Sequence, residues 1–124
     1  KYIWRYRINS LLTSVFIFMA IHTSFICDNE DLNLLIRNNL NGDFSKAENI
    51  LEINPGAFIN ISWKDEELML PYSPRKGFIS FSDKKWDFRY KLDDKQYLNE
   101  DEPSLYELLP NSKFIEHKCN LKDN

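Results

Sequence analysis

The strongest constraint on the fold of this chain is a period-two alternation of apolar and polar side chains in residues 57–92. The last run is the clearest, because apolar residues there alternate with charged ones: Trp86, Phe88, Tyr90 and Leu92. Such alternation predicts strands with one face in the core and one face in solvent. Shorter runs at 57–64, 68–72 and 78–82 are separated by polar turns. This spacing predicts an antiparallel meander.

Pro71 limits where the run at 68–72 can lie in a sheet. Proline has no N–H, so it cannot donate to a neighbouring strand on that side. We therefore expect this strand to be an edge strand or to end early.

Residues 29–40 carry the pattern of a helix. Four apolar residues recur at three- and four-residue intervals: Leu32, Leu35, Ile36 and Leu40. Asp28 stands where an N-cap is expected, and Asn41-Gly42 is a typical helix stop. The predicted fold class is thus α+β, with this helix packed on a mainly antiparallel sheet of four to six strands.

The first 27 residues differ from the rest of the chain. Three basic residues precede an apolar run at 11–26, and an acidic stretch begins at Asp28. This order indicates a secretory signal peptide. The sequence has no good cleavage site, so an uncleaved membrane anchor is the alternative. In either case residues 28–124 form one small domain outside the cytoplasm, which is periplasmic, extracellular or anchored facing outward.

Charge narrows the choice of partners. The whole chain has a formal charge of −3, and residues 28–124 alone have −6, because residues 1–27 contain three basic and no acidic side chains. A net-acidic domain is a poor match for nucleic acid or for an anionic membrane surface. We expect the partner to be another envelope or extracellular protein, with membrane contact only through an uncleaved N-terminal segment. Lys-, Asn- and Ile-rich usage indicates a bacterial source.

Cys27 and Cys119 are the two cysteines of the chain. In an oxidising compartment they can form a disulfide that joins the two ends of the domain. We expect a final strand at 113–119. His117 lies two residues before Cys119 in this strand, so both side chains face the same side. That pair offers two metal ligands or a nucleophile with its base, but no further cysteine or mature histidine is present to complete a site.

An acidic segment at 93–102 is the candidate partner-binding region. Its five acids are Asp93, Asp94, Glu100, Asp101 and Glu102. The segment lacks the D-x-D-x-D-G spacing and the glycine of a calcium loop, so a solvated surface for a basic partner is the better interpretation.

Four aromatic residues raise the alternative of a sugar-stacking platform: Trp63, Tyr72, Trp86 and Tyr90. They also occupy the apolar faces of the predicted strands, which favours a role in the core. Phe58 and Phe78 fall out of phase with their strands and are candidates for an exposed contact. Since no catalytic motif is present, we expect a non-catalytic interaction module without a metal or cofactor. A carbohydrate or small-ligand binding domain, or an envelope hydrolase with a carboxylate pair, are the alternatives.

Overall fold

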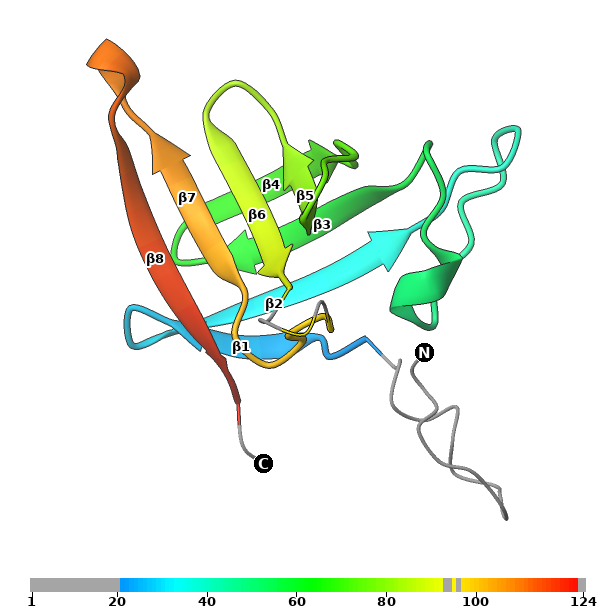
Figure 1. The fold of residues 1–124 in the computed structure, drawn as a ribbon, viewed down its shortest axis with the longest axis horizontal. Helices are drawn as coiled ribbons and strands as arrows, with labels where there is room; N and C mark the ends of the chain where they lie inside the picture. The colour runs from blue at the N-terminus through cyan, green and yellow to red at the C-terminus, as the bar shows by residue number, and fades with distance from the viewer. Residues whose placement is uncertain (1–20, 93–94, 96, 123–124) are drawn as a thin grey trace.

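A computed structural model describes residues 21–92, 95 and 97–122 of the chain. Eight antiparallel strands form one continuous sheet that curls into a nearly closed barrel (Figure 1). Their bounds are β1 Ser24–Cys27, β2 Glu30–Arg37, β3 Phe58–Trp63, β4 Glu66–Pro71, β5 Phe78–Ser82, β6 Trp86–Lys91, β7 Ser104–Leu108 and β8 Phe114–Leu121. The described residues contain no α-helix, only the 3₁₀ turns η2 (Ile50–Glu52) and η3 (Pro110–Ser112).

The order of strands across the sheet is β4-β3-β2-β1-β8-β7-β6-β5. Strands that follow one another in the chain are neighbours within each half, β1–β4 and β5–β8. The halves are joined by pairing of β1 with β8, which we call the β1–β8 junction. At the opposite side β4 and β5 are the two ends of the sheet, and we call their meeting the β4–β5 junction.

The predicted helix at residues 29–40 is wrong, and so is the α+β class. Most of this segment forms β2, in which Leu32, Leu34 and Ile36 are buried on one face. The helical interpretation used Leu35 and Leu40 instead, but Leu35 is only half-buried and Leu40 is 55% exposed. Adjacent leucines at 34 and 35 allow both periodicities, so the local pattern could not separate helix from strand.

The two predicted helix ends are hairpin turns. Asp28 and Asn29 have φ of 53° and 63° and connect β1 to β2. Asn41 and Gly42 have φ of 56° and 89°, and Leu40 and Asp43 exchange two backbone hydrogen bonds of 3.0 Å around them. Two successive residues with positive φ are characteristic of the type I′ turn, where Asn, Asp and Gly are preferred. The same residue types serve helix ends and tight hairpins.

The antiparallel sheet itself is confirmed. Strands β3 to β6 lie where the alternation predicts them, and β4 is an edge strand that ends at Pro71. The predicted count of four to six strands is too low, because β1, β2 and β7 were not predicted. β1 is formed by the last residues of the predicted export segment, and residues 1–20 lie outside the described part.

The interior is filled with aromatic side chains. Phe25, Phe81 and Phe88 are fully buried, and Tyr90 is 1% exposed. Between the halves, the Trp63 and Trp86 rings pack edge to face with centroids 6.2 Å apart. Such pairs add to the stabilisation by burial. The prediction that Trp86, Phe88 and Tyr90 form the core face of β6 is therefore confirmed.

In the described residues, no helical segment is long and apolar enough to cross a membrane.

Candidate partner-binding surface

The β1–β8 junction is closed by a disulfide. Cys27 and Cys119 face each other directly in the register of β1 and β8, with Cα atoms 4.2 Å apart. Ser24 and Lys122, three residues away, form a hydrogen-bonded pair. The cysteines therefore occupy a non-hydrogen-bonded pair, where opposite Cα atoms approach most closely. The predicted disulfide is confirmed, and it is compatible with export to an oxidising compartment.

His117 points into the barrel beside this disulfide and is 8% exposed. Its Nδ1 pairs with the carboxylate of Asp28, and its ring lies 4.9 Å from that of Trp63. The indole N–H of Trp63 donates to the carbonyl of Cys27 at 3.0 Å. Because the Cys119 sulfur is bonded to Cys27, it is neither a metal ligand nor a nucleophile in this state. Within the described ranges, no group of three potential metal-ligating side chains converges.

The aromatic side chains considered as a sugar platform lie mostly inside. Trp63 is 3% exposed, Trp86 5% and Tyr90 1%, while Tyr72 is half-buried against Phe81. A ring with so little exposed area cannot present a face to a sugar. The structure thus assigns these residues to the core.

The predicted acidic region is only partly described, since Asp93 and Asp94 lie outside the described residues. Glu102 is exposed, and Asp101 lies 3.5 Å from the Nε2 atom of His22. Glu100 is half-buried, and this burial, together with the charge of Asp101, raises its pKa from 4.5 to about 7. The three described acids therefore have different surroundings.

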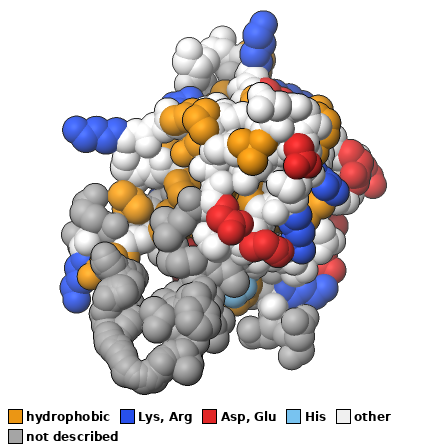
Figure 2. Space-filling view, turned by 90° about the vertical axis from the view of Figure 1, so that its right-hand side faces the viewer, with side chains coloured by type: hydrophobic (Ala, Val, Ile, Leu, Met, Phe, Trp, Pro, Cys, Tyr) orange, Lys and Arg blue, Asp and Glu red, His pale blue; other side chains and the backbone are white. Residues whose placement is uncertain are grey.

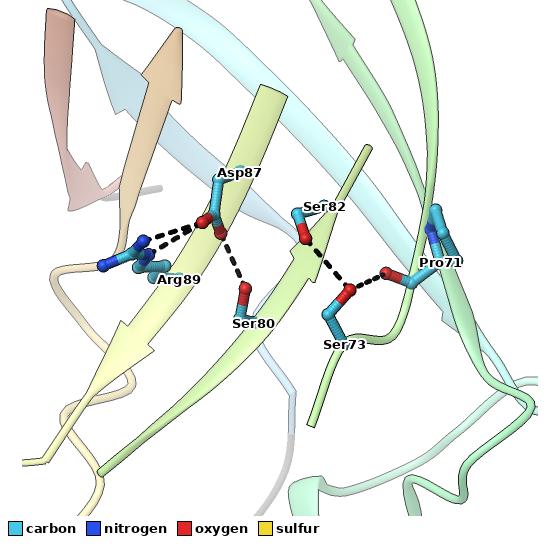
Figure 3. Close-up of polar contacts among 6 residues, drawn as sticks. All are labelled: Pro71, Ser73, Ser80, Ser82, Asp87 and Arg89. Atoms are coloured by element: carbon cyan, nitrogen blue, oxygen red, sulfur yellow. Dashed lines mark hydrogen bonds and ion pairs between the residues drawn. The ribbon is translucent and has the colours of Figure 1, made fainter. Parts of the chain in front are cut away.

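Asp87 contradicts the expectation that the charged residues of β6 face solvent, because it is only 3% exposed. Arg89 donates to its Oδ2 atom from Nε at 3.0 Å and from Nη2 at 2.8 Å, and Ser80 donates to Oδ1 at 2.7 Å (Figure 3). The guanidinium carbon of Arg89 lies 4.5 Å from the centroid of Phe78 and 4.8 Å from that of Tyr106. Two rings and a carboxylate hold Arg89 in one position on the outer face.

A second polar network extends from this position across β6, β7 and β8. Ser104 donates to Glu116 at 2.8 Å, and Lys91 lies 3.3 Å from the same carboxylate oxygen. The hydroxyl of Ser104 is the main reason that the pKa of Glu116 is lowered. The pKa of Lys91 is raised, chiefly by its hydrogen bond with Tyr106. Lys91 and Glu116 therefore remain charged over the neutral pH range.

Exposed apolar side chains continue this surface along the hairpin of β7 and β8. Leu108 and Phe114 are directly paired across it and are 39% and 60% exposed. The ring of Phe114 packs edge to face on Tyr106, with centroids 5.4 Å apart. We call the set of Arg89, Lys91, Tyr106, Leu108 and Phe114 the hairpin patch. The hairpin projects at one end of the barrel (Figure 1).

The face that carries the loop between β2 and β3 looks different. There, hydrophobic side chains occur in small separate groups among acidic and basic ones (Figure 2). The hairpin patch instead joins an apolar pair to a network of fixed charges.

Sequence reasoning missed the hairpin patch, although one signal was present. Phe114 and Ile115 are adjacent in a predicted strand, so at least one of them must leave the core. Both are exposed, at 60% and 43%. The position of Arg89 between two rings had no such signal, because Phe78 and Tyr106 lie on other strands.

A protein-family model described as "Domain of unknown function (DUF8671)" matches residues 35–119. The match runs from the middle of β2 to Cys119 and leaves out β1 and Cys27. No curated protein and no solved structure matches the chain.

Proposed function

The chain belongs to the DUF8671 family, and we propose that it is a non-catalytic interaction module outside the cytoplasm. In this proposal the hairpin patch binds another protein of the envelope or the extracellular space. The observation that carries the proposal is the exposed Leu108–Phe114 pair beside an arginine that is already held in place.

The composition of the hairpin patch supports protein recognition. Phenylalanine and arginine are enriched at protein interfaces, and arginine is among the most frequent hot-spot residues. Tyr106 is only 8% exposed, and its ring supports Arg89 and Phe114. Arg89 is held by the contacts described above, so little of its side-chain entropy is lost when a partner binds. The positive charges of Arg89 and Lys91 are balanced by Asp87 and Glu116. The patch therefore suits a partner surface that combines apolar and polar groups.

The disulfide supports the extracytoplasmic part of the proposal. Disulfides persist in secreted and periplasmic proteins and are rare in the cytosol. Cys27 follows directly after the apolar run at 11–26, so a signal peptide cut before Cys27 leaves the bridge intact. An uncleaved anchor leaves the bridge intact too, and it would hold the domain against the outer side of a membrane.

Site-specific photocrosslinking tests the proposed binding surface. A photoreactive phenylalanine analogue at position 114 should crosslink to a discrete partner in cells that export the protein. The matched control places the analogue at Lys118, which is exposed on the outer face of the same strand. Equal crosslinking from both positions, or none from position 114, would count against the hairpin patch.

Tryptophan fluorescence tests the carbohydrate-binding alternative. The burial of Trp63 and Trp86 gives that alternative no support. If the protein is an interaction module, glycans should leave the emission of the folded protein unchanged. Saturable quenching by a glycan would favour the alternative.

A further inference from the structure

The outer edge of β4 has free backbone groups. Tyr72 donates from its backbone N–H to Ala57 at 2.9 Å, which shows that even-numbered residues of this strand pair with β3. The backbone groups of Glu67, Met69 and Pro71 must then point away from β3, because hydrogen-bonding direction alternates along a strand. No strand of the described chain pairs with Glu67 or Met69 on that side.

Pro71 explains why the β4–β5 junction stays open. Ser73 donates from its backbone to Ser80 at 2.8 Å, and the next pair along this ladder would join Pro71 to Ser82. Proline has no N–H to donate. The two serine hydroxyls bridge the gap instead, with Ser82 donating to Ser73 at 2.9 Å and Ser73 to the carbonyl of Pro71 at 3.5 Å (Figure 3). Beyond this point β4 and β5 are not paired.

The side chain of Met69 makes this edge unusual. At 65% it is the most exposed large hydrophobic side chain of the described residues. Edge strands normally avoid an exposed apolar side chain in the middle of the strand, because such a side chain favours pairing with another chain.

The charges at the two ends of β4 are opposite in sign. Asp65, Glu66 and Glu67 are exposed at its start, and Arg75 and Lys76 are exposed just beyond its end. A two-fold related copy running antiparallel places the acidic start of one strand beside the basic end of the other. Such an isologous contact satisfies both charge groups at once.

We propose that β4 pairs antiparallel with β4 of a second copy of this chain, with Met69 opposite Met69. The two Met69 residues exchange two backbone hydrogen bonds, and each Glu67 donates to the carbonyl of Pro71 in the other copy. This register keeps the two Glu67 side chains apart, whereas a register centred on Glu67 would place like charges directly opposite. It also brings the two methionine side chains together on one face.

The contact is small, so the dimer is weak and forms at high protein concentration. Sedimentation velocity of the oxidised full chain should show a monomer–dimer equilibrium. Met69→Pro removes the outward N–H but no bond to β3, and should weaken association at least about tenfold. Met69→Val, which keeps the N–H and an apolar side chain, is the matched control and should still dimerise.

A charge exchange tests the antiparallel orientation of the two β4 strands without touching the strand backbone. Glu66→Lys and Arg75→Glu should each weaken self-association, because each places like charges together. An equimolar mixture of the two variants should associate again, since both end contacts of the mixed dimer then join opposite charges.

Hydrogen exchange gives a third measurement that does not depend on variants. The amides of Glu67 and Met69 should become protected as protein concentration rises, while that of Asp65 in the adjoining turn should not. A protein that stays monomeric at the highest concentration reached would overturn the proposal. So would a dimer that Met69→Pro leaves intact, or one whose concentration-dependent protection appears on β7 and β8 instead.

Discussion

The two junctions between the halves of the barrel are closed by different means. At the β1–β8 junction three successive residue pairs join the strands, Cys27–Cys119 bridges them, and the rings of Trp63 and His117 pack together beside the bridge. At the β4–β5 junction pairing stops at Pro71, and two serine hydroxyls take over from the backbone. One junction holds the sheet together and the other leaves an edge available. The difference shows that a barrel-like sheet need not be closed evenly to enclose one core.

The largest expected effect is loss of the disulfide. The bridge spans 92 residues, and the chain-entropy model assigns roughly 4–5 kcal/mol to such a loop. Replacing Cys27 and Cys119 by Ala should lower the free energy of unfolding by about that amount, measured by urea denaturation. A loss below about 1 kcal/mol would show that β1–β8 pairing and the core hold this junction without the bridge.

Trp86→Ala tests whether the two halves share one core. The change removes a ring that is 5% exposed and contacts Trp63 of the other half. Deleting a buried large aromatic side chain costs about 3–5 kcal/mol, so unfolding should remain a single transition at lower denaturant. Two separate transitions, seen by circular dichroism and by Trp63 fluorescence, would mean that the halves unfold independently.

The serine bridge at the β4–β5 junction should matter much less. Ser82→Ala removes the donor to Ser73, and a single hydrogen bond contributes about 0.5–1.5 kcal/mol. The matched variant Pro71→Thr restores an N–H opposite Ser82 and should extend the ladder by one bond, making the protein slightly more stable. If Pro71→Thr destabilises the protein instead, the interruption at Pro71 has another cause.

Glu100, in the loop beyond β6, should make the stability of the protein depend on pH. The pKa of Glu100 rises from 4.5 to about 7 on folding, chiefly because of burial. Folding therefore favours the protonated form, which adds stability below pH 4.5, and this contribution is lost as pH rises towards 7. In Glu100→Gln this decline between pH 4.5 and 7 should disappear, as measured by thermal unfolding across that range. The effect should be modest, because water near a half-buried carboxyl screens it.

The strands show most clearly how much of the fold the local sequence pattern predicts. Alternation along residues 57–92 predicts β3 to β6 because each has one face in the core, and period-two burial is a local property. Pro71 predicts an edge strand because its missing donor is a property of one residue. The prediction of a helix at 29–40 is wrong because burial there depends on partners outside the segment. Pairing with β1 and β3 buries Leu34 rather than Leu35. However, β3 is distant in the sequence, and β1 was assigned to the export segment.

The candidate site likewise has features that the sequence predicts and features that it does not. Because Phe114 and Ile115 are adjacent apolar residues in a strand, the sequence predicts that at least one of them is exposed, but not which. Burial of Asp87 cannot be predicted in this way, because Ser80 from β5 and the rings that hold Arg89 reach it only in the folded sheet. The acidic region was predicted from composition alone, and its three described members differ because each meets different neighbours.

By itself, the sequence determined the alternating strands, the edge at Pro71, the aromatic core and the two cysteines at the ends of the domain. The tertiary structure decided that residues 29–40 form a strand, that Cys27 faces Cys119 across the β1–β8 junction, and that Leu108 and Phe114 stay outside. The physical reason is the separation along the chain over which each effect acts. Periodicity and backbone chemistry act within a few residues, whereas strand pairing and burial depend on partners that only the folded barrel brings into contact.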